Sequence, residues 1–219
     1  MIGRLSTPDW VETLRAASRR TLQTGFGPDA GEFVRTFSDE LGHRRAVDAP
    51  LLAWTTGTEL NRQQPTVPES ADVSLWWALL GPADHSSRWL TAGASAPLIA
   101  HAPEQPIEVW TESELCALHA AWHHARRNSD GALRERCLNA AAWHVQHMQP
   151  DNATNHPWAI HVFIILRDAR NDSAADLYAQ TLLHNCQVAL GKPDRFSACV
   201  VMDAADALQR FVGEDPGPI

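Results

Sequence analysis

Residues 114–123 of this chain read ELCALHAAWH, and the related sequence ERCLNAAAWH follows at residues 135–144. The two segments share a glutamate, a cysteine and a closing Ala-Ala-Trp-His, each offset by 21 residues. Such an offset is about the length of one helix and a tight turn. The repeat therefore predicts a helical hairpin built from two similar halves.

Further helices are predicted around this hairpin, because apolar residues recur at helical spacing between capped turns. A capping box, Thr111-Glu112-Ser113-Glu114, is expected to open the first repeat helix. The predicted fold class is all-α, an array of antiparallel helical hairpins or an irregular helical bundle. Helices are predicted at about 112–127, 131–148, 156–168, 173–190 and 196–212.

The first half of the chain is predicted to be helical with long loops. Thr7-Pro8-Asp9 is a favourable helix start, and further helices are expected at about 29–41, 71–80 and 84–91. The proline-rich stretch 93–110 has room for a short strand at 98–100 or 107–110, although no partner strand is evident. We expect one domain, 1–219, comprising an irregular part at 1–110, a compact hairpin core at 111–212 and a flexible tail at 213–219.

Composition excludes several function classes. A net charge of −8 without a concentrated basic face argues against nucleic-acid binding. The longest apolar run, at 162–166, is too short to span a bilayer. The four cysteines include no C-x-x-C pair and are expected to be reduced, in a soluble, cytoplasmic, tryptophan- and histidine-rich protein.

The repeated helices also carry histidines at metal-chelating spacing. His119 and His123 are an i, i+4 pair, and His144 and His147 lie on the second helix. However, Cys116 and His123 are about 10 Å apart along the helix axis, so one ion cannot bind both. No H-E-x-x-H motif occurs. The sequence favours packing roles for these side chains, with no cofactor and no stoichiometric metal.

A neutral core role is likewise expected for His161, which lies in an almost wholly apolar segment where burial disfavours the charged ring.

The loop at 149–156 is the best sequence candidate for a ligand site. Polar groups beside an indole face are typical of sugar and polyol sites, and Asp151 with His156 offers a general acid or base. The same residues also suit a turn and a helix cap. The candidate ligand-binding residues are Trp143, Gln149, Asp151, Asn152, Asn155, His156 and Trp158.

Residues 111–166 resemble the repeat unit of α/α-toroid proteins, the group of terpenoid cyclases, prenyltransferases and hairpin carbohydrate enzymes. The resemblance is carried by Ala141-Ala142-Trp143, Gln149-Pro150-Asp151 and Trp158. It implies stacked antiparallel hairpins whose loops face the mouth of a helical barrel, where substrates bind. The chain departs from the pattern because it has no D-x-D-D motif and has Asn152 where glycine is common.

Three function classes remain open from the sequence. The first, which we favour, is a non-catalytic helical-repeat module that binds a protein partner through exposed tryptophan. The second is a carbohydrate- or polyol-binding protein or enzyme that uses the 149–156 loop. The third is a transition-metal-binding protein that uses His119, His123, His144 and His147.

Overall fold

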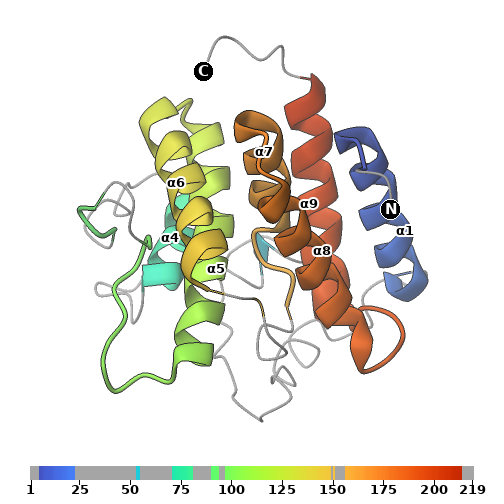
Figure 1. The fold of residues 1–219 in the computed structure, drawn as a ribbon, viewed down its shortest axis with the longest axis horizontal. Coiled ribbons are helices and arrows are strands. Elements are labelled where there is room, and N and C mark those ends of the chain that lie inside the picture. Colours follow the sequence, from blue (N-terminus) through green and yellow to red (C-terminus); the bar gives the residue numbers. More distant parts are fainter. Residues whose placement is uncertain are drawn as a thin grey trace.

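The computed structural model describes residues 5–22, 53–54, 71–80, 90–93, 97–148, 150 and 156–213. Within these ranges the chain is all-α, with seven helices and no strand, as the sequence predicts (Figure 1). The predicted helix at 29–41 lies outside the described residues, and so does 84–91 except for 90–91, which are not helical. The helices are α1 (Thr7–Leu22), α4 (Ala71–Leu80), α5 (Ile107–Arg127), α6 (Gly131–His147), α7 (Ile160–Arg170), α8 (Ser173–Val188) and α9 (Arg195–Gly213).

The repeated segments form α5 and α6, which run side by side in opposite directions (Figure 1). Asp130 caps α6, because its carboxylate accepts a hydrogen bond from the backbone N–H of Leu133 at 2.9 Å. Helix α8, after the turn that follows α7, is also capped by an aspartate. Asn171 is left-handed (φ 50°), and the Asp172 carboxylate accepts from the N–H of Ala174 at 2.9 Å.

Two predicted helix starts are wrong. The helix predicted from 112 begins at Ile107, so 107–110 form its first turn and not a strand. Thr111 is no cap, since its hydroxyl donates to the Ile107 carbonyl inside the helix (2.8 Å). The helix predicted from 156 begins at Ile160, because Ala159 is left-handed (φ 56°, ψ 13°) and breaks the helical path before that residue.

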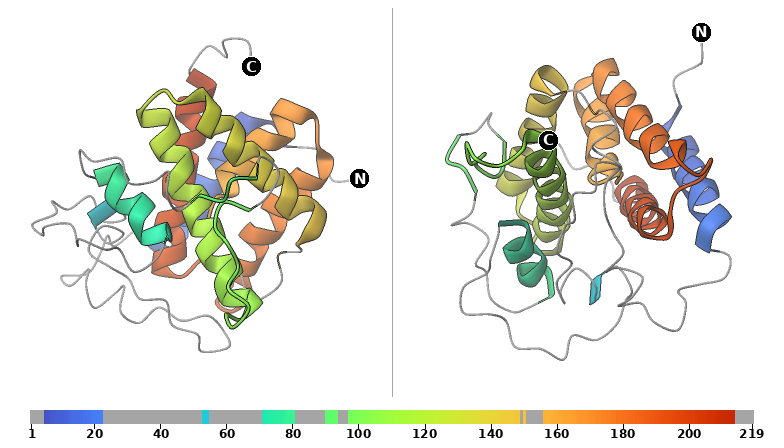
Figure 2. Two further views of the ribbon diagram at one scale, coloured as in Figure 1. Left: turned by 90° about the vertical axis from the view of Figure 1, so that its left-hand side faces the viewer. Right: turned by 90° about the horizontal axis from the view of Figure 1, so that it is seen from below.

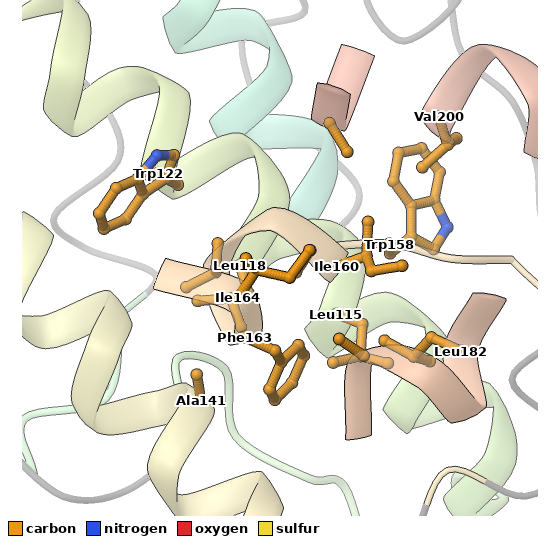
Figure 3. Packing of buried hydrophobic residues seen from close by; sticks show 14 of the residues in the cluster. Leu115, Leu118, Trp122, Ala141, Trp158, Ile160, Phe163, Ile164, Leu182 and Val200 are labelled. Carbon is orange, nitrogen blue, oxygen red and sulfur yellow. The ribbon is translucent and has the colours of Figure 1, made fainter. Parts of the chain in front are cut away.

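The hydrophobic core lies where α5 and α7 meet, and side chains from α6, α8 and α9 complete it. Figure 3 shows Leu115 and Leu118 of α5 packed near Phe163 and Ile164 of α7. Every residue of α7 from Ile160 to Leu166 is buried, so this helix is central to the fold. None of the described helices is long and apolar enough to cross a membrane.

Helices from the first half of the chain pack on this core: α1 lies along α9, and α4 lies against α5 (Figures 1 and 2). The buried guanidinium of Arg167 ties α1 in place. It donates to the Leu5 carbonyl at 2.7 Å and to the Asp176 carboxylate at 2.9 Å. The indole N–H of Trp10 donates to the same Asp176 oxygen at 3.0 Å. Residues near the start of the chain therefore meet residues of α7 and α8 at one buried polar junction.

Candidate metal centre

Four side chains from three helices converge beside the core: His119 and His123 of α5, His161 of α7 and Asp203 of α9. We call them the His–Asp cluster. The Nε2 atoms of His119 and His123 each lie 2.7 Å from Oδ2 of Asp203. One nitrogen from each of the three imidazoles falls within 4.8 Å of the other two. The cluster therefore brings together donor atoms separated by as many as 84 residues.

The helices explain this convergence. Residues four apart lie on one helix face, so His119 and His123 point the same way from α5, with ring centroids 5.1 Å apart. His161 enters from the first turn of α7, and its ring centroid lies 4.6 Å from that of His119 and 5.3 Å from that of His123. Asp203 closes the cluster from an apolar face of α9. The cluster therefore depends on how α5, α7 and α9 pack together.

His161 is the unusual member of the cluster. It is fully buried, and neither ring nitrogen has a hydrogen-bond partner among the described residues. Burial, together with the nearby His119 and His123, lowers the pKa of His161 well below its ordinary value. The ring is therefore neutral and carries one unprotonated nitrogen. A buried polar atom without a hydrogen-bond partner reduces the stability of the fold by about 1–3 kcal/mol. The lone pair of the His161 ring makes no hydrogen bond to the described residues.

Asp203 supplies negative charge to the cluster. Burial alone would raise its pKa, but His123 and the hydrogen bonds from both histidines outweigh that effect and hold the pKa well below its ordinary value. Burial lowers the pKa of His119, against the opposing influence of Asp203. The side chain of Asp203 is 25% exposed, whereas those of His119 and His123 are 1% and 5% exposed. The carboxylate is therefore the solvent-facing edge of the cluster.

A pocket of about 200 Å³ adjoins this edge. Its walls include the rings of Trp54, Trp76 and Trp158, beside His119 and Asp203. The indole N–H groups of two of these rings are satisfied, since Trp76 donates to Cys116 Sγ at 3.0 Å and Trp158 donates to Glu112 at 2.7 Å. These bonds fix the rings as pocket walls.

Side chains of α9 also line the pocket. Figure 3 shows Trp158 next to Val200, which lines the same pocket. Cys199, Met202 and Asp206 complete this side.

The other candidate histidines lie elsewhere. His144 is buried with its Nε2 3.6 Å from Glu114 Oε1, and neither of its ring nitrogens has a hydrogen-bond partner in the part of the chain that the structure describes. Glu114 itself accepts from the N–H groups of Leu98 and Ile99 at 2.6 and 2.8 Å, which gives it a structural task. His147 is exposed, and its Nδ1 lies 2.9 Å from the carbonyl of Trp143 in the preceding turn. The structure thus brings together His119 and His123 but not His144 or His147.

Most of the candidate ligand loop lies outside the described residues, including Gln149, Asp151, Asn152 and Asn155. Its described end, His156, is 3% exposed, and its Nδ1 lies 2.9 Å from the Ser197 hydroxyl. Of the two flanking tryptophans, Trp158 lines the pocket. Trp143 stacks instead on His147, with ring centroids 4.8 Å apart.

Sequence reasoning missed Asp203 and gave His161 only a core role. Each carried a usable signal, because each is a polar residue inside an apolar helical stretch: Ile160 to Leu166 for the histidine, and Val200 to Ala205 for the aspartate. What the sequence could not supply was the approach of α7 and α9 to the same face of α5.

No protein-family model, curated protein or solved structure matches this chain.

Proposed function

We propose that the protein binds one divalent transition-metal ion at the His–Asp cluster. The observation that carries this proposal is His161, a fully buried neutral imidazole with both nitrogens unpartnered among the described residues. One of its nitrogens lies within 4.8 Å of a nitrogen of each of two further imidazoles, which share an ionised carboxylate. An ion would use the lone pair that the protein leaves unused.

The donor chemistry selects the kind of ion. Imidazole nitrogens with one carboxylate suit Zn²⁺ or Fe²⁺, whereas Mg²⁺ and Ca²⁺ prefer all-oxygen sites. Cys199, which lines the adjoining pocket, is not the expected donor, because burial raises the pKa of its thiol to about 12. Nitrogen ligands at 2.0–2.1 Å from zinc lie about 3.4 Å apart in a tetrahedral site. The imidazole nitrogens of the cluster lie within 4.8 Å of one another, so the rings that bind the ion would have to move closer together.

The axial distance that weighs against a metal site in the sequence separates Cys116 from His123, which are too far apart along one helix to share an ion. In the His–Asp cluster only the i, i+4 pair comes from α5, and the other donors come from α7 and α9.

Elemental analysis tests the proposal directly. The full chain, made without a polyhistidine tag, is stripped with a chelator, reloaded with Zn²⁺ or with Fe²⁺ under anaerobic conditions, and desalted. About one ion per chain is expected, with loss of binding in His161→Gln. The matched control is His147→Gln, which changes an exposed histidine outside the cluster and should still bind the ion. A wild-type chain that retains no ion, or a His161→Gln chain that binds as well as wild type, contradicts the proposal.

A further inference from the structure

The lone pair of the His119 ring already accepts a hydrogen bond. The backbone N–H of Ala159 donates to Nδ1 of His119 at 3.1 Å in the buried interior. A neutral imidazole has one protonated nitrogen and one acceptor nitrogen. Since Nδ1 accepts, Nε2 carries the proton, and it donates that proton to Asp203 at 2.7 Å. Nε2 of His119 therefore has no lone pair for a metal ion. Nε2 of His123 lies equally close to Asp203, but among the described residues no group hydrogen-bonds to its Nδ1, so its proton can move to Nδ1 when an ion binds Nε2.

The backbone holds His119 in this tautomer. Ala159 precedes α7 in a left-handed conformation (φ 56°), which is costly for a residue with a Cβ. If an ion bound Nε2 of a neutral His119, the proton would move to Nδ1 and face the Ala159 N–H. Two donors would then oppose each other in a buried position, which is a substantial penalty.

Three donors remain for the ion: His123, His161 and Asp203. Two imidazoles and one carboxylate form the ligand set that leaves coordination positions open in non-haem iron sites, and three protein ligands likewise leave an open position on zinc. In such sites the ligating carboxylate is commonly oriented by a hydrogen bond from outside the ligand set. The hydrogen bond from His119 to Asp203 supplies this orientation.

The pocket provides space for a ligand beside the cluster. It reaches His119 and Asp203, and Trp54 lies against His123 with ring centroids 4.9 Å apart. A cavity of roughly 150 Å³ can hold a benzene-sized molecule, so a pocket of about 200 Å³ has room for a small ring and a donor group. Three indole rings among the lining residues favour an apolar or aromatic body.

We infer that the ion is held by His123, His161 and Asp203, that His119 is a positioning residue for the carboxylate, and that the open coordination positions accept a small ligand with an aromatic body and a metal-binding donor. This inference rests on the proposed metal function. It adds a ligand set, a role for His119 and a ligand class.

Cobalt substitution tests the ligand set, because the visible spectrum of Co²⁺ reports both binding and coordination number. The same change, histidine to glutamine, is made at three positions. His123→Gln and His161→Gln should lose Co²⁺, whereas His119→Gln should bind it with a spectrum close to wild type, since the glutamine amide can still donate to Asp203. His119→Ala, which cannot donate, should bind about 10- to 100-fold more weakly. Circular dichroism of the metal-free variants checks that each one folds.

The open positions are tested by adding azide, acetohydroxamate and benzohydroxamate to the Co²⁺ protein. Each should shift the visible spectrum, and benzohydroxamate should bind more tightly than acetohydroxamate because its ring enters the tryptophan-lined pocket. Loss of Co²⁺ in His119→Gln, a spectrum unmoved by all three probes, or equal affinity for the two hydroxamates would overturn the inference. A wild-type protein that binds no Co²⁺, Zn²⁺ or Fe²⁺ would instead reject the proposed function itself.

Discussion

The ring of His161 meets the ring of His119 edge to face, with centroids 4.6 Å apart and planes inclined at 79°. The two rings differ in one respect. His119 uses both nitrogens, toward Ala159 and Asp203, while His161 uses neither among the described residues. Two unsatisfied buried nitrogens should destabilise the metal-free protein, whereas a phenyl ring at this position has no such atoms.

His161→Phe should therefore stabilise the chelator-treated protein while abolishing metal binding. The gain expected from removing two unsatisfied buried atoms is about 1–3 kcal/mol, reduced by any repacking around the larger ring. Urea denaturation in the presence of a chelator measures it. The matched control is His156→Phe, which deletes a buried histidine that is bonded to Ser197 and should lose about 1 kcal/mol. Equal losses at both positions would mean that His161 is an ordinary core histidine.

The buried thiols should make stability fall at high pH. Burial raises the pKa of Cys186 and of Cys199 to about 12, against an unfolded value near 9.0. The unfolded chain therefore releases these protons at a pH where the folded chain keeps them. The stabilisation is complete below pH 9 and declines as pH rises from 9 toward 12. Urea denaturation at pH 8, 9 and 10 should show the decline. Cys186→Ala/Cys199→Ala should lessen it but leave a part, because burial also raises the pKa of the Cys137 thiol. A wild-type profile that is flat between pH 8 and 10 would be incompatible with these pKa shifts.

Arg167 and Arg170, one helical turn apart on α7, should differ strongly in their contributions to stability. The Arg167 side chain is 1% exposed and pairs with Asp176 at 2.9 Å, whereas Arg170 is 34% exposed and pairs with Glu135 at 2.6 Å. Breaking a buried pair costs about 3–5 kcal/mol, and an exposed pair contributes about 0–1 kcal/mol. Arg167→Ala should therefore unfold at much lower urea than Arg170→Ala. Similar midpoints for the two variants would show that the junction with α1 is not a major stabilising feature.

Much of the fold follows from local sequence signals. The repeat at 114–123 and 135–144 correctly predicts the α5–α6 hairpin, because helix period and turn residues are local properties. Errors occur where a local signal has two meanings. Thr111 suits an N-cap, but in the structure it bonds back to Ile107 within a longer helix that Pro106 precedes.

Of the four residues of the His–Asp cluster, only two could be placed together from the sequence. The i, i+4 spacing of His119 and His123 is visible in the sequence and correctly places both rings on one face. The contribution of His161 and Asp203 depends on how α7 and α9 pack against α5, and this packing is set by apolar burial over many residues. The tautomer of His119 depends on one backbone N–H, that of Ala159, which no side-chain pattern reveals.

Anomalous X-ray diffraction from crystals of the zinc-loaded protein, measured on both sides of the zinc absorption edge, tests the central claim most directly. We expect one anomalous peak within about 2.2 Å of a nitrogen of His123, a nitrogen of His161 and an oxygen of Asp203. His119 should remain bonded to the Ala159 N–H. Absence of a peak at the His–Asp cluster, or a single peak beside His144 or His147 instead, would contradict the account.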